Sequence, residues 1–329
     1  MWERLIPADP GLFFSKGDPH DPRLGEVVRR LGGPQDAPLL EGADAALLGV
    51  PEDRGILANK GREGARLGPR AIRKAFYRLT PGFNPFLSDL KLVDLGDIRT
   101  QGRTLEEVHE DLASVVGEVA ALGVVPLVLG GGHDLAYPDL LGLCTGLKLG
   151  EGQLGVINVD QHLDVRDLSF GGITSGTPFY RALEELPGRP LRGENFVEYG
   201  VQESHNSPYY YNWLMERRAT ILTLGEVQGR PIETFLKSLQ LAGRGPRVLT
   251  VSVDIDAVRS TDAPGASAGS PNGLSAQDVA KIAHLAGRTE RVRLLDILET
   301  CPPLDQDGRT ASLGADILFW FLKGMCERR

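Results

Sequence analysis

The sequence VINVDQHLDVRD, residues 156–167, begins as an apolar strand and continues into ionisable side chains. Asp160, His162 and Asp164 occupy every second position, and residues i, i+2 and i+4 of an extended segment lie on one face. Two carboxylates and an imidazole are therefore directed toward a common point. Like charges aligned on one face repel one another and would cost several kcal/mol if partly buried. The stretch predicts a buried strand whose end binds a cation.

Eight apolar runs, one of which contains VINV, are typical of buried strands. Their hydrophobicity is continuous rather than alternating, which indicates strands that are covered on both faces. They lie at residues 45–50, 91–96, 124–130, 154–160, 196–201, 219–224, 248–254 and 292–298. Helical patterns separate them, for example at 105–122 and at 275–287, where Ser275 can cap the first turn. The alternation predicts a three-layer αβα fold with a mostly parallel, doubly wound sheet of about eight strands, with a TIM barrel as the alternative.

The composition indicates one globular domain and argues against several kinds of partner. No repeat or shift in composition divides the 329 residues, so we expect a single domain over residues 1–329 with an irregular N-terminal arm of about 40 residues. The 44 acidic and 36 basic residues give a net charge of -8, which argues against nucleic acid as a partner. No apolar run approaches about 18 residues, so we expect no membrane span. Three widely spaced cysteines without a CxxC pair indicate reduced thiols in the cytoplasm.

Ionisable side chains follow three of the predicted strands at their carboxyl ends, which is where ligands bind in open parallel sheets. Each has an ordinary explanation alone, because histidines occur in loops and strand-end aspartates cap turns. Together they offer four carboxylates, whose charge of about -4 balances two divalent cations, and two neutral imidazole nitrogens. The candidate metal ligands are His133, Asp160, His162, Asp164, Asp254 and Asp256. Such mixed donors without thiolate suit Mn²⁺, Fe²⁺, Co²⁺ or Zn²⁺.

A site with two cations indicates hydrolysis as the reaction class. Six side chains that share two ions require bridging carboxylates, which place the ions about 3.5–4 Å apart. A hydroxide held between them forms near neutral pH and attacks a planar electrophilic carbon. A two-metal phosphatase or nuclease would use the same ligands. The acidic composition argues against it, and GGGHD lacks the GK[ST] ending of a phosphate-binding loop.

The motifs GGGHD, DQHLD and SVDID, in this order and at predicted strand ends, resemble those of the ureohydrolases, the family of arginase, agmatinase and formimidoylglutamase. The segment LETCPPLDQDGRTASLGADIL near the C-terminus is similar as well. The resemblance implies an arginase-like α/β fold, two Mn²⁺ ions per chain and an assembly of identical subunits. It places one ion among His133, Asp160, Asp164 and Asp254, and the other among His162, Asp160, Asp254 and Asp256.

Three segments resemble the formimidoylglutamase subgroup in particular. They are residues 55–76, with the sequence NKGR inside them, residues 162–180 and residues 196–210. Phe179 stands where arginases carry a histidine that shuttles protons, which argues against an arginase. The resemblance therefore favours N-formimidoyl-L-glutamate, a small molecule with one amidine group and two carboxylates, as the substrate.

Basic and polar side chains in these segments can bind such a substrate. Arg166 has a planar fork of donors that can bind a carboxylate through two hydrogen bonds. Lys60 and Arg62 lie on a loop whose glycines allow close approach, and they can serve the second carboxylate. Ser175 and Asn206 complete the predicted substrate contacts.

The leading hypothesis is hydrolysis of N-formimidoyl-L-glutamate to L-glutamate and formamide, a step of histidine degradation. A hydroxide that bridges the two metals would attack the formimidoyl carbon, with Asp164 orienting it. Glu299, at the end of the last predicted strand, would pair with the amidine nitrogens and stabilise the tetrahedral intermediate. The alternatives are an agmatinase or arginase that acts on a guanidino substrate, and a non-catalytic protein with the ureohydrolase fold.

Overall fold

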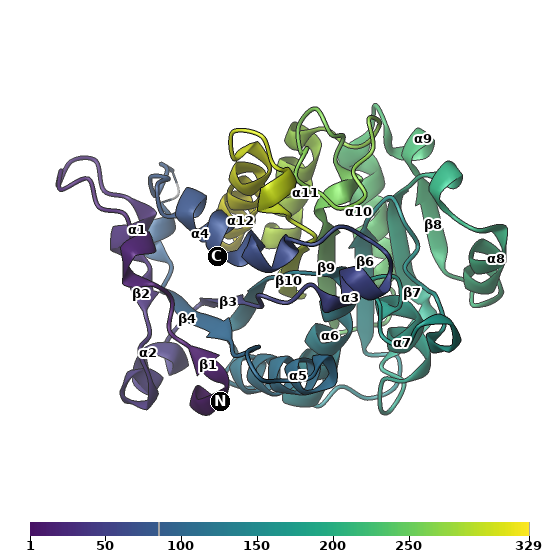
Figure 1. Ribbon diagram of the computed structural model, residues 1–329, viewed down its shortest axis with the longest axis horizontal. Helices are drawn as coiled ribbons and strands as arrows, with labels where there is room; N and C mark the ends of the chain where they lie inside the picture. The colour runs from purple at the N-terminus through teal and green to yellow at the C-terminus, as the bar shows by residue number, and fades with distance from the viewer. Residues whose placement is uncertain (85, 329) are drawn as a thin grey trace.

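A ten-stranded sheet runs through the middle of the molecule, with helices on both of its faces (Figure 1). The computed structural model describes residues 1–84 and 86–328. Eight strands are parallel and follow the order β4-β3-β5-β10-β9-β6-β7-β8. They are β3 (Ala45–Gly49), β4 (Leu92–Ile98), β5 (Val125–Leu129), β6 (Leu154–Val159), β7 (Leu191–Val201), β8 (Thr220–Thr223), β9 (Val248–Asp254) and β10 (Val292–Leu298). The predicted doubly wound sheet is confirmed, and its open edges exclude a barrel.

Two short strands at one edge were not predicted. β1 (Leu5–Ile6) pairs antiparallel with β4, and β2 (Arg29–Arg30) pairs with β4 in parallel. Each has two residues, and neither forms an apolar run that could be recognised in the sequence. They attach the N-terminal segment, which also contains α1 (Leu24–Val27) and α2 (Ala37–Glu41), to the edge of the sheet.

Two layers of helices cover the sheet. One layer contains α4 (Gly68–Phe76), α9 (Leu224–Val227), α10 (Pro231–Ala242), α11 (Ala276–Arg288) and α12 (Arg309–Cys326). The other contains α5 (Leu105–Ala121), α6 (Ala136–Gly146), α7 (Pro178–Glu184) and α8 (Pro208–Glu216). Successive strand residues such as Leu47 and Leu48 belong to the two different cores, which explains the continuous hydrophobicity of the strands. No helix in residues 1–84 and 86–328 has the length and apolarity that a membrane span requires.

Side-chain caps fix where the longer helices begin. Thr104 accepts a hydrogen bond from the backbone N–H of Glu107, whose carboxylate accepts one from the N–H of Thr104, so the first turn of α5 is closed reciprocally. Ser275 and Asp278 do the same for α11. The predicted cap at Ser275 is therefore confirmed.

The strand order brings four carboxyl ends together at the centre of one edge. β5, β10, β9 and β6 are neighbours in the sheet, and a polar segment follows each of them. α3 (Arg54–Ala58) and the loop after it lie next to this edge (Figure 1). The fold therefore collects segments from four distant parts of the chain at one place.

A buried ion pair connects α4 to the sheet. The side chain of Arg73 is 1% exposed and donates to both carboxylate oxygens of Asp94, at 2.8 and 3.0 Å, and to Asp97. Asp94 also accepts from the hydroxyl of Tyr77. Burial would lower the pKa of the Arg73 guanidinium, but the charges of Asp94 and Asp97 hold this pKa above its usual value.

We expect Arg73→Met to lower the free energy of unfolding by about 3–5 kcal/mol, because it leaves Asp94 buried without its partner. Urea unfolding of the purified protein measures this change. Arg70→Met is the control on the same helix, since its pair with Asp9 is exposed and we expect little change. Equal midpoints for the two variants would contradict this account of the ion pair.

Candidate active site

The first cluster of candidate ligands surrounds the imidazole of His133. Its Nδ1 lies 3.1 Å from Asp160, 3.0 Å from Asp164 and 3.2 Å from Asp254, measured to one oxygen of each carboxylate. His133 follows β5, Asp160 follows β6 and Asp254 ends β9, so three strand ends meet here. These four side chains could hold one metal ion.

A second cluster lies beside the first and shares Asp160 with it. The Nδ1 of His162 lies 3.4 Å from Oδ1 of Asp160 and 3.3 Å from Oδ2 of Asp256, and these three side chains could hold another ion. Asp160 therefore presents one oxygen to each histidine. Asp254 presents Oδ2 to the first cluster, while its Oδ1 accepts the backbone N–H of Asp256 at 2.8 Å. A role for Asp254 as a ligand of both ions stays a prediction.

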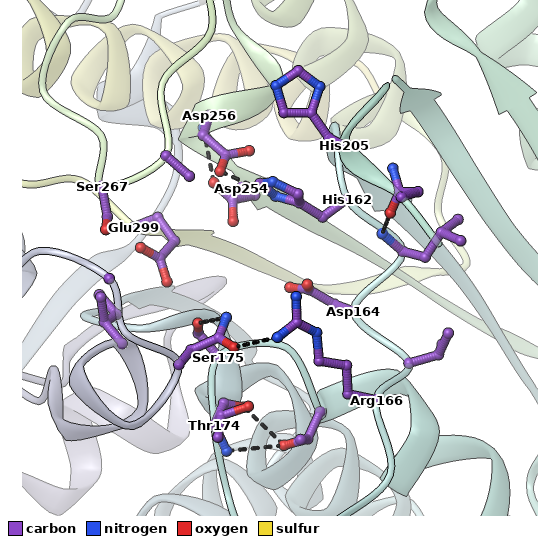
Figure 2. A pocket seen from close by; sticks show the side chains of 18 of the residues that line it. His162, Asp164, Arg166, Thr174, Ser175, His205, Asp254, Asp256, Ser267 and Glu299 are labelled. Atoms are coloured by element: carbon purple, nitrogen blue, oxygen red, sulfur yellow. Dashed lines mark hydrogen bonds and ion pairs between the residues drawn. The ribbon is translucent and has the colours of Figure 1, made fainter. Parts of the chain in front are cut away.

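The backbone aims these side chains at one another. Figure 2 shows His162, Asp164, Asp254 and Asp256 converging from their loops. Asp164 and Glu299 have φ angles of 44° and 64°, in a left-handed region that is uncommon for residues other than glycine. Such positions cost free energy and persist where the surrounding structure determines them.

The charges of the cluster fit divalent cations. Burial raises the pKa of Asp254 well above its usual value, and the charges of Asp256 and Asp160 raise it further. Burial alone would lower the pKa of His133, but the adjacent carboxylates of Asp160, Asp164 and Asp254 raise it well above its usual value. Protons therefore compensate the carboxylates when no cation does. Two metal ions would take over this compensation with oxygen and nitrogen donors of suitable type.

Two polar side chains outside the cluster orient His133. Its Nε2 lies 3.0 Å from the hydroxyl of Ser252, and this hydroxyl donates to Asp296. Because Ser252 uses its proton for Asp296, it accepts one from Nε2 of His133, so that in the neutral imidazole the lone pair of Nδ1 faces the cluster. Nδ1 of His133 is buried and faces the carboxylates of Asp160, Asp164 and Asp254. Burial raises the pKa of Asp296 to about 6.

Ser252 and Asp296 were not predicted as site residues from the sequence. A signal was present for both. Ser252 precedes Asp254 by two positions on β9 and so shares its face, and Asp296 interrupts the buried run of β10. An acid inside a fully buried strand needs a hydrogen-bond donor nearby.

Glu299 lies directly after β10, on the wall of the cavity. Its backbone N–H donates to the carbonyl of Gly131 at 2.7 Å, and its Oε1 accepts the N–H of His133 at 3.0 Å. Burial raises the pKa of its carboxyl well above the usual value, and the charge of Asp256 adds to this. Glu299 is thus fixed to the loop that carries His133, with its carboxyl directed into the cavity (Figure 2).

A cavity of about 720 Å³ opens above the cluster. His162, Asp164, Asp254, Asp256 and Glu299 line its acidic part, whereas His133 and Asp160 are fully buried beneath it. All five predicted substrate contacts line the same cavity, namely Lys60, Arg62, Arg166, Ser175 and Asn206. They come from the segment after α3, the loop after β6 and the segment after β7.

These five side chains differ in the hydrogen bonds that they form within the protein. The amide of Asn206 bonds to the backbone of Leu163, Gln161 and Gln202, so it ties the loop after β6 to the segment after β7. Arg62 donates to the carbonyls at 266 and 267. Arg166 and Ser175 are joined through a residue that the sequence analysis did not single out, Asn59. Contacts of all five with a substrate stay predictions.

His205 is a further cavity residue that the sequence did not mark as a site. Its ring lies edge-on to that of His162, with 6.0 Å between the ring centroids, and its Nδ1 lies 3.0 Å from the hydroxyl of Ser204. It therefore covers one side of the second cluster (Figure 2).

An open parallel sheet with histidines and aspartates gathered at its carboxyl edge, below a polar cavity, defines a class of protein, the hydrolases of the arginase fold. Comparison with known proteins agrees with this class. The arginase family model matches residues 43–323, and the chain belongs to the arginase family.

Individual relatives are similar over nearly their whole lengths. Formimidoylglutamase from Streptococcus gordonii is 31% identical over 320 residues, which cover 97% of this chain and 92% of that protein. The structure of Trypanosoma cruzi formiminoglutamase with Mn²⁺ superposes with a TM-score of 0.84 at 34% identity, over 94% of this chain and 100% of that one. Formimidoylglutamase from Bacillus subtilis gives a TM-score of 0.85 at 25% identity, over 95% and 94% of the two chains. The protein is a hydrolase of this family.

We expect Ser252→Ala to weaken Mn²⁺ binding by about 10- to 100-fold, because the imidazole of His133 loses the acceptor that fixes its tautomer. Calorimetric titration of the metal-depleted protein with Mn²⁺ measures the affinity. Thr250→Val is the matched control, since it removes a buried hydroxyl two positions away on the same face of β9 that forms no hydrogen bond with the described residues. Unchanged affinity in Ser252→Ala would show that the serine does not orient the histidine.

Proposed function

We propose that this protein is a formimidoylglutamase, which hydrolyses N-formimidoyl-L-glutamate to L-glutamate and formamide with two Mn²⁺ ions. The observation that carries the proposal is the position of Arg166. Its guanidinium lies on the wall of the same cavity that the acidic residues line. Relatives named formimidoylglutamase and the Mn²⁺-containing structure from Trypanosoma cruzi support the substrate and the metal. A place in histidine degradation follows from this substrate.

The charges around the cavity match the charges of this substrate. Arg166 and Lys60 are both exposed cations on its wall, and the substrate has two carboxylates at one end. Glu299 and Asp164 lie on the acidic side, and the substrate has a basic amidine at the other end. Arginine offers one carboxylate and agmatine none, so either guanidino substrate would leave a cation of the wall without a partner.

The residues of the chain have separate roles in the proposed reaction. Metal ions bound by the two clusters would supply Lewis-acid chemistry that lowers the pKa of water toward neutrality. Asp164 would orient the attacking water, because this carboxylate belongs to the first cluster and, like Asp254, also lines the cavity. Glu299 would accept hydrogen bonds from the amidine nitrogens and so hold the formimidoyl carbon in place. Arg166 would bind a carboxylate at the far end.

The remaining expectations belong to the same proposal. We infer a single domain over residues 1–329, which the extent of the family match supports. A cytoplasmic protein without nucleic acid or membrane partners fits the acidic composition and the three free cysteines. We infer a homo-oligomer from membership of the family.

The deciding experiment is an assay of product release by the Mn²⁺-loaded enzyme with three candidate substrates. We expect formamide from N-formimidoyl-L-glutamate and no urea from L-arginine or agmatine. Asp254→Ala, which removes a carboxylate from the first cluster, serves as the inactive control, and Asp316→Ala, on the exposed side of α12, serves as the active one. Urea release without formamide would overturn the substrate and leave the family unchanged.

Arg166→Ala tests the side chain that we expect to bind a carboxylate of the substrate and so to distinguish these substrates. We expect KM for N-formimidoyl-L-glutamate to rise about 10- to 100-fold, because the carboxylate loses hydrogen bonds to a charged group, while kcat changes little. Steady-state kinetics on the Mn²⁺-loaded enzyme separate the two constants. An unchanged KM would remove Arg166 from substrate binding.

A further inference from the structure

A chain of hydrogen bonds crosses the cavity wall from Ser175 through Asn59 to Arg166. The amide Nδ2 of Asn59 donates to the hydroxyl of Ser175 at 3.0 Å. Nη1 of Arg166 donates to Oδ1 of Asn59 at 2.9 Å. Figure 2 shows the guanidinium of Arg166 directed toward Ser175. Both polar atoms of the Asn59 side chain are therefore used.

The backbone holds Asn59 and Ser175 at fixed separation. The carbonyl oxygen of Gly55 in α3 accepts the N–H of Asn59 at 3.1 Å and the N–H of Ser175 at 3.0 Å. One atom thus anchors both ends of the hydrogen bond between their side chains. The first turn of α3 and the loop that contains Ser175 form one unit at the cavity wall.

Arg166 reaches Asn59 because a glycine lies beneath its side chain. The N–H of Arg166 donates to the carbonyl of Gly176 at 2.8 Å. A Cβ atom at Gly176 would lie 3.1 Å from Cδ of Arg166 and 3.4 Å from Nδ2 of Asn59. A larger residue would therefore displace the Arg166 side chain by a few tenths of an ångström, and glycine leaves the two side chains room to cross.

The guanidinium keeps donors available for a ligand. In the described part of the chain, its hydrogen bond to Asn59 is the one that its side chain forms, and no carboxylate pairs with it. Nε and Nη2 are therefore free to bind. Arg166 is exposed, so without this bond its long side chain would sample many rotamers, and binding would have to order it.

We propose that Asn59 is the positioning residue that sets the preference of the enzyme for a carboxylate-bearing amidine. This inference rests on the proposed function. A neutral amide suits the task, because it accepts from Arg166 without cancelling the charge and donates to Ser175 at the same time. An aspartate there would keep the geometry, since the hydroxyl of Ser175 can donate, but it would compete with the substrate for the guanidinium.

The test compares Asn59→Ala and Asn59→Asp with the wild-type Mn²⁺-loaded enzyme. For N-formimidoyl-L-glutamate, we expect KM to rise about three- to tenfold in Asn59→Ala, with kcat within about twofold, because a hydrogen bond to a charged group is lost. We expect KM to rise also in Asn59→Asp, and to stay unchanged for a formimidoyl alkylamine without carboxylates. If Asn59 served folding alone, Asn59→Asp would restore the wild-type KM, and Asn59→Ala would change KM for both substrates.

A double-mutant cycle with Arg166→Ala isolates the pair. We expect Asn59→Ala to have no further effect on KM when Arg166 is absent. Asn272→Ala is the matched control, because this exposed asparagine lies outside the cavity and pairs with Gln228. The thermal midpoint of each variant reports on folding separately.

The outcomes separate the inference from the proposed function. If Arg166→Ala raises KM and Asn59→Ala does not, the inference is overturned and the function stands. If no formamide is released, the function is overturned, and calorimetric titration with L-glutamate decides the inference. Weaker glutamate binding in Asn59→Ala and Asn59→Asp would then support it, and equal binding would overturn it.

Discussion

The repulsion between buried carboxylates at one point is the constraint on which the rest of the structure depends. Asp160, Asp164, Asp254 and Asp256 lie within a few residues of two strand ends and contact two histidines. Loops alone would not hold like charges so close, because they could relax apart. A sheet that is covered on both faces can do so, since moving one strand end would disturb a packed core. The large apolar interior therefore maintains a small polar cluster that opposes folding.

Side chains of both charges line the cavity. Residues of the two clusters and Glu299 contribute the acids, and Arg166 and Lys60 are among the cations of its wall. Such an arrangement orients a dipolar ligand before any close contact forms, because reversal would place like charges together. It also explains why the protein leaves Arg166 without an acidic partner. An internal ion pair at that position would hold the guanidinium equally well but would remove its charge from the ligand.

Features that depend on local sequence were predictable, and features that depend on contacts between distant segments were not. The eight parallel strands follow from continuous apolar runs, and the candidate ligands follow because they come directly after those strands. Asn59 lies in the NKGR motif, but its role could not be predicted, since its partners Arg166 and Ser175 are 107 and 116 positions away. Ser252 is likewise 119 positions from His133. The strand order brings these residues together, and that order cannot be predicted from a single sequence.

The position of β10 has a consequence for how the molecule is assembled. β10 pairs with β5 on one side and with β9 on the other, so it is the seam between a half-sheet made of β1 to β5 and another made of β6 to β9. Among the strands of the described residues it comes last along the chain, so it is synthesised after the others. Until then both half-sheets have an unpaired edge, and a nascent chain exposes two surfaces prone to wrong pairing. Assembly of the acidic cluster and closure of the sheet thus wait for the same seven residues, Val292–Leu298.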